Sequence, residues 1–200
     1  MKLIFENQTI HFDRFPSVEE IFDKIKEFLS DQYFFSHLKI DGEEVYDDPE
    51  SYLLECLESI SIIEVVVKTI HEFVNEVLHM TDDYLKRAIP EITTVADGFY
   101  QSPSSNNWTD FSNMLEGIQW LIQMVELIDK TNERPANWDE CIKITTKFEM
   151  ELASLVEAVK NTDHILIADV LQYELLPLFE TLETEVKNTI DIEGKRNDIN

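Results

Sequence analysis

Hydrophobic residues follow two different patterns along the chain, and the change between them falls near Lys68. Before that point, short apolar runs alternate with polar turns. These runs are rich in β-branched or aromatic residues, which predicts strands at Leu3–Phe5, Thr9–Phe12, His37–Ile40, Glu44–Tyr46 and Ile60–Val67. After Lys68, apolar residues recur at intervals of three and four, which predicts helices for the remaining chain.

The first part of the chain also has two helical patterns. Ser17 and Glu20 have the spacing of a capping box, just before apolar residues at helical spacing from Val18 to Leu29. Pro49 begins a shorter helical pattern that ends near Glu58. Asp41-Gly42 is a turn signal between the third and fourth predicted strands.

Residues 1–68 therefore have the element order strand, strand, helix, strand, short strand, short helix, strand. This order resembles the ubiquitin-like β-grasp fold, with the opening strand Met1–Phe5, the helix after Pro16, the turn Asp41–Glu44 and the last strand Val65–Val67 as the matching features. Conjugated members of that family end in a free Gly-Gly tail, whereas here the last strand continues into Lys68–His71. The resemblance therefore implies a built-in binding module, without conjugation.

Residues 69–190 contain four amphipathic segments joined by short loops. The segments are Ile70–Phe99, Trp108–Lys130, Trp138–Lys160 and His164–Ile190. Such a pattern predicts an up-down four-helix bundle, so the expected fold class is α+β. Pro90 should bend or break the first segment. The charged residues 191–200 are expected to form a frayed tail.

The charge of the chain narrows the classes of partner. Apolar residues make up 44% of the sequence, enough for a buried core, but 41 Asp and Glu face only 16 Lys and Arg. The formal net charge of −25 argues against nucleic acid and against an anionic membrane, because both are bound through clustered basic residues. It favours another protein, and a basic one, as the partner.

The expected compartment is the bacterial cytoplasm. The start Met1–Glu6 does not read as a signal peptide, and no segment reaches the length of an uncharged membrane span. Cys56 and Cys141 lie far apart, without metal-ligand spacing, which indicates reduced thiols.

Motifs that carry enzyme chemistry are scarce. Only four glycines occur, and neither a glycine-rich phosphate loop nor a nucleophile motif is present. Glu76 and His79 have the Glu-x-x-His spacing of di-iron bundle sites, but a second such pair is missing. We therefore expect a solvated glutamate and a surface histidine, with no metal, no cofactor and no catalytic residue.

The candidates for a protein-binding site lie inside the last predicted helix and near the starts of two others. Pro177 interrupts a helical pattern and frees the carbonyl near Tyr173, which predicts a kink. Together with Asp169 and Glu174, these residues form either a polar docking patch or part of a bent core helix. Trp108 and Trp138 either close the ends of the bundle or mark an exposed binding surface.

The sequence thus predicts a non-enzymatic adaptor or scaffold protein that binds another protein. One alternative is a chaperone of secretion or flagellar export, a class of small acidic helical proteins that shield amphipathic helices of their substrates; a large exposed apolar groove would favour it. A further alternative is a metal-dependent helical-bundle enzyme centred on Glu76 and His79, which requires further carboxylates or histidines nearby.

Overall fold

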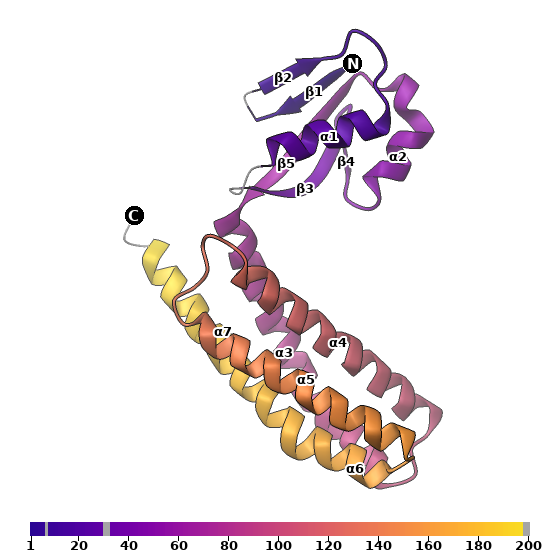
Figure 1. Ribbon diagram of the computed structural model, residues 1–200, viewed down its shortest axis with the longest axis vertical. Coiled ribbons are helices and arrows are strands. Elements are labelled where there is room, and N and C mark those ends of the chain that lie inside the picture. Colours follow the sequence, from indigo (N-terminus) through magenta and orange to yellow (C-terminus); the bar gives the residue numbers. More distant parts are fainter. Residues whose placement is uncertain (7, 30–32, 198–200) are drawn as a thin grey trace. The chain divides into compact units, whose positions relative to one another are not determined.

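The computed structural model describes residues 1–6, 8–29 and 33–197 and has an α+β fold (Figure 1). The chain divides into two compact units, Met1–Phe73 and Val74–Asn200. This division falls five residues after Lys68, where the sequence pattern changes. The unit boundary lies beyond Lys68 because residues 70–73, the first turn of the following helix, pack with the N-terminal sheet. The contact is made by the stacked rings of Phe34 and Phe73.

The N-terminal unit contains a five-stranded mixed sheet in the order β2-β1-β5-β3-β4. Strands β1 and β5 are parallel, and the other neighbouring pairs are antiparallel. The strands are β1 (Lys2–Phe5), β2 (Gln8–His11), β3 (Tyr33–Ile40), β4 (Glu43–Val45) and β5 (Ile62–Thr69). Strand β3 begins four residues earlier than predicted, and a register shift between Phe35 and His37 interrupts its pairing with β5.

Two helices complete this unit. Helix α1 (Val18–Phe28) lies across the sheet, and α2 (Pro49–Cys56) leads into the 3₁₀ turn η1 (Leu57–Ser59) (Figure 1). The core between α1 and the sheet is made of buried aliphatic and aromatic side chains, among them Leu3, Phe5, Ile21, Ile25, Leu38 and Ile63. Burying these side chains stabilises the unit by roughly 1.5–3 kcal/mol each relative to exposure.

Local sequence signals fix the ends of these elements. The capping box is confirmed, because the Ser17 hydroxyl accepts from the Glu20 amide and the Glu20 carboxylate accepts from the Ser17 amide. Asp41 and Gly42 both have positive φ, 47° and 95°, the backbone of a tight hairpin turn. The Asp41 carboxylate also accepts the amides of Ser61 and Ile62, which attaches this turn to the start of β5.

The second unit is helical. Its segments are α3 (Ile70–Tyr100), α4 (Ser105–Asp129), α5 (Trp138–Lys160), α6 (His164–Asp169), the π-helical turn η2 (Val170–Leu175) and α7 (Leu176–Asn197). The backbone of α5 closely approaches those of α4 and α7, whereas α3 keeps a wider backbone separation from α4. Large buried side chains such as Phe99, Phe148 and Phe179 fill the space between the helices.

Two expectations for the helical unit need correction. Pro90 does not break α3, which is continuous through Tyr100. The last helix does not end near Ile190, because α7 extends to Asn197, and Glu193 is buried. The residues expected as a frayed tail are therefore helical as far as Asn197, and residues 198–200 lie outside the described part.

Candidate functional site

The π-helical turn η2 sits one turn before Pro177, where the sequence predicts a kink. Proline has no amide hydrogen and its ring crowds the carbonyl four residues earlier, so a regular α-helix is disfavoured at this point. The chain instead forms a π-helical turn, which is wider than an α-helical turn. In it the Leu176 amide donates to the Leu171 carbonyl five residues back. Pro177 therefore coincides with a π-helical turn in the chain before it.

The predicted polar patch around this turn is only partly assembled. The Tyr100 hydroxyl, from the end of α3, donates to the Asp169 carboxylate at 2.6 Å, which raises the pKa of Tyr100. Tyr173 is 66% exposed beside this pair. Glu174 and Pro177 are also exposed, but the hydrogen bond beside them joins only Tyr100 and Asp169. Four surface cavities in the described residues are lined by other positions.

The two tryptophan candidates have different surroundings. Trp138 is 1% exposed, and its indole N–H donates to the Val125 carbonyl at 3.0 Å, so its proposed place on a binding surface is wrong. It is buried because a large apolar ring at the start of α5 fills the gap beside the end of α4. Trp108 is half-buried, with edge contacts to Phe99 and His164. Trp108 therefore packs against the end of α3, where Phe99 lies, and the start of α6, where His164 lies.

The Glu-x-x-His pair shows no sign of a metal centre. Glu76 and His79 are both exposed on α3. Within residues 1–6, 8–29 and 33–197, no group of three or more His, Cys, Asp or Glu is placed to hold a metal ion. The same described part contains no helix that is both long enough and apolar enough to cross a membrane.

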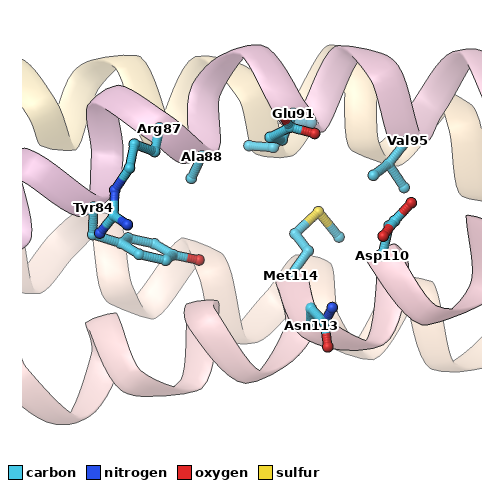
Figure 2. A pocket seen from close by; sticks show the side chains of 9 residues that line it. Tyr84, Arg87, Ala88, Glu91, Val95, Asp110, Asn113 and Met114 are labelled. Atoms are coloured by element: carbon cyan, nitrogen blue, oxygen red, sulfur yellow. The ribbon is translucent and has the colours of Figure 1, made fainter.

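A groove between α3 and α4 is the surface feature that sequence reasoning missed. It consists of two adjoining cavities of about 320 Å³ and 510 Å³, which share Tyr84, Arg87 and Asn113 in their linings. Figure 2 shows side chains that line the first cavity, with Met114 directed from α4 toward the space below α3. We call these two cavities together the α3–α4 groove.

The groove has an apolar floor in both of its cavities. In the first cavity the floor is formed by Ala88, Ile92, Val95 and Met114. In the second it is formed by Met80 and Trp120. Met80 is 52% exposed, although it lies on a helix whose other apolar residues are largely buried. A solvent-exposed methionine in a concave surface is typical of sites that accept an apolar partner.

Tyr84 crosses the middle of the groove and touches α4. Its ring makes an edge contact with Trp120, with centroids 5.6 Å apart. The hydroxyl lies where a Cβ atom of residue 117 would be, only 1.6 Å from that position, so the contact requires Gly117. Partial burial raises the pKa of Tyr84 above its ordinary value. Gly117 inside a predicted helix and Met80 are visible in the sequence, but spacing alone does not reveal that both line one groove.

A known protein family matches most of the second unit. Residues 76–185 match the family described as "Domain of unknown function (DUF8042)", which is more than half of the chain. The chain belongs to this family. The matched residues include the whole α3–α4 groove and the π-helical turn η2, whereas the N-terminal sheet lies outside them. Searches of the curated proteins and of the solved structures found no match.

Proposed function

We propose that this protein is a non-enzymatic adaptor whose α3–α4 groove binds a helical segment of another protein. The observation that carries the proposal is an open apolar surface between two helices, with Met80 half in solvent. Helical ligands commonly lay an apolar face into such a groove between two helices. The proposal includes no catalytic step.

The proposal also assigns a fold to each of the two units. The strand order β2-β1-β5-β3-β4, with α1 across the sheet, supports a ubiquitin-like β-grasp module. The helical segments α3, α4, α5 and α6–α7 support an up-down four-helix bundle. Strand β5 passes directly into α3, so the module has no free tail at that point. Free Cys56 and Cys141 support a reducing compartment such as the bacterial cytoplasm.

Site-specific photo-crosslinking in the source cells tests the groove. A photoreactive benzoylphenylalanine replaces Met80 in the full chain, and a second version carries it at Met150, which is 64% exposed on α5 outside the groove. We expect a discrete crosslinked protein from position 80 and none of it from position 150. Mass spectrometry of the crosslinked peptide then identifies the segment that occupies the groove.

A blocking variant shows whether the crosslink depends on the groove. Asn113 is exposed and lines both cavities, so Asn113→Trp fills the groove from α4 without disturbing the core. Ser112→Trp adds the same side chain at the neighbouring exposed position, which lines neither cavity. The crosslink should disappear in the first variant and persist in the second. Equal crosslinking in both variants, or no crosslink from position 80, would overturn the proposal.

An export chaperone is a second candidate, because the same groove is able to shield an amphipathic helix of an export substrate. The identity of the crosslinked protein separates the two functions. A segment from an exported protein supports the chaperone, and a segment from a resident protein supports the adaptor. The metal-dependent enzyme gains no support from the exposed positions of Glu76 and His79.

A further inference from the structure

The rim of the α3–α4 groove is acidic. The carboxylates of Asp83 and Glu91 lie on the α3 side, and those of Asp110 and Glu116 lie on the α4 side. Arg87 is the one basic residue among the residues that line the two cavities. Figure 2 shows Glu91 and Asp110 on opposite sides of the first cavity. An apolar floor is thus bordered by negative charge on both sides.

These rim charges are available to a partner. In the described part of the chain, Glu91, Asp110 and Glu116 take part in no ion pair. The Asp83 carboxylate lies 3.8 Å from the Lys86 ammonium, a long and exposed pair. The guanidinium of Arg87 donates to the Asp83 backbone carbonyl at 3.1 Å, and it forms no ion pair with the rim carboxylates.

The length of the groove limits the length of its occupant. On α3 the lining runs from Met80 to Val95. At about 1.5 Å per residue, these fifteen steps span about 22 Å, the length of about four helical turns. Tyr84 and Arg87 contribute to both cavities, so they divide this length into two compartments.

We infer that the groove binds a basic amphipathic helix of about four turns, with an apolar stripe bordered on both sides by Lys or Arg. This inference rests on the proposed function and adds the chemistry of the partner. The stripe would contact Met80, Trp120 and Met114, while the basic residues would face the rim carboxylates. Charge complementarity of this kind selects partners and speeds association. The same rim repels nucleic acid and anionic lipid.

Binding of a designed peptide to the purified full chain tests the chemistry. The probe is a fluorescein-labelled helical peptide of about four turns, with a Leu stripe flanked by Lys. One matched peptide has Glu in place of each Lys, and another has the same composition in an order without a stripe. Fluorescence anisotropy should show binding of the Lys peptide that weakens with salt, and at least about tenfold weaker binding of both matched peptides.

Charge reversal on the protein locates the binding. Glu91→Lys with Asp110→Lys should weaken the Lys peptide about tenfold and improve the Glu peptide. The matched control is Glu149→Lys with Glu180→Lys, two exposed positions on α5 and α7 outside the groove. It makes the same change in net charge and should leave the affinity for the Lys peptide nearly unchanged.

Each outcome bears on one of the two claims. Equal weakening by the control pair would mean diffuse attraction to an acidic protein, and it would overturn the inference. Equal affinity for the Lys and Glu peptides, or tighter binding of RNA or of anionic vesicles, would overturn it as well. The crosslink from Met80 remains a separate measurement. If it identifies an acidic or neutral segment, the proposed function stands and the inference fails.

Discussion

Gly117 is the position where one added methyl group tests the fit between α3 and α4. A Cβ atom at this position would lie 1.6 Å from the Tyr84 hydroxyl and 2.6 Å from Cζ. In Gly117→Ala, the Tyr84 ring must therefore leave its place over α4. The substitution also removes a flexible residue from a helix interior, which by itself favours folding by about 1 kcal/mol.

The loss of the Tyr84 contacts outweighs this gain. Displacing a partly buried tyrosine ring exposes about 100 Å², which costs about 2.5 kcal/mol at about 25 cal/mol per Å². The edge contact with Trp120 contributes about 1 kcal/mol more. We expect Gly117→Ala to lower the free energy of unfolding by about 2.5 kcal/mol. In a Tyr84→Ala background the obstacle is absent, and the same substitution should stabilise the chain by about 1 kcal/mol.

Urea unfolding of the four chains measures both values. All three tryptophans lie in the helical unit, so tryptophan fluorescence follows the unfolding of that unit, and circular dichroism provides an independent signal. The decisive quantity is the sign of the Gly117→Ala effect with and without Tyr84. The same sign in both backgrounds would refute the packing of Tyr84 against Gly117, and with it the division of the groove into two compartments.

Four further predictions concern buried or hydrogen-bonded groups. Trp138→Phe leaves a gap in the core and removes the indole hydrogen bond to the Val125 carbonyl, and it should cost about 2 kcal/mol in urea unfolding followed by circular dichroism. Burial raises the pKa of Cys141 to about 12, so iodoacetamide should label Cys56 first, and mass spectrometry should find Cys141 labelled only after unfolding. Because the thiol ionises near pH 9 in the unfolded chain, stability should fall from about pH 9 to about pH 12, and Cys141→Ala should reduce that loss in thermal unfolding. Asp169→Asn should lower the pKa of Tyr100, measured by NMR of ring-labelled tyrosine, and an unchanged value would exclude the hydrogen bond in solution.

The α+β class and most element positions follow from local chemistry in the sequence. Ser17, the Asp41-Gly42 pair and Asp163 each act at one end of an element, because side-chain capping and positive φ depend only on near neighbours. The charged residues from Asp191 onward, with Gly194 among them, predict fraying, whereas α7 is helical to Asn197. The buried Glu193 shows that tertiary packing extends further along that helix.

The groove could not be found in the same way. Helical spacing assigns Met80 and Trp120 to faces of their own helices, but it does not give the distance between α3 and α4. The position of Trp138 illustrates the same limit. Its place at a helix start was visible in the sequence, whereas its burial depends on the end of α4, thirteen residues away at Val125. Sites between elements depend on packing distances that periodicity does not encode.

The π-helical turn η2 also adjusts the angular phase of the last helix. Four fully buried residues of α6, η2 and α7 follow one another at intervals of four: Ile167, Leu171, Leu175 and Phe179. In a regular α-helix each interval of four turns the stripe by about 40°, so three intervals would rotate it by about 120° away from the core. The wider turn holds about one extra residue and compensates for about 100° of that rotation. A relative that lacks one residue between positions 170 and 175 should therefore have a regular α-helix there, with the same residues of α7 facing the core.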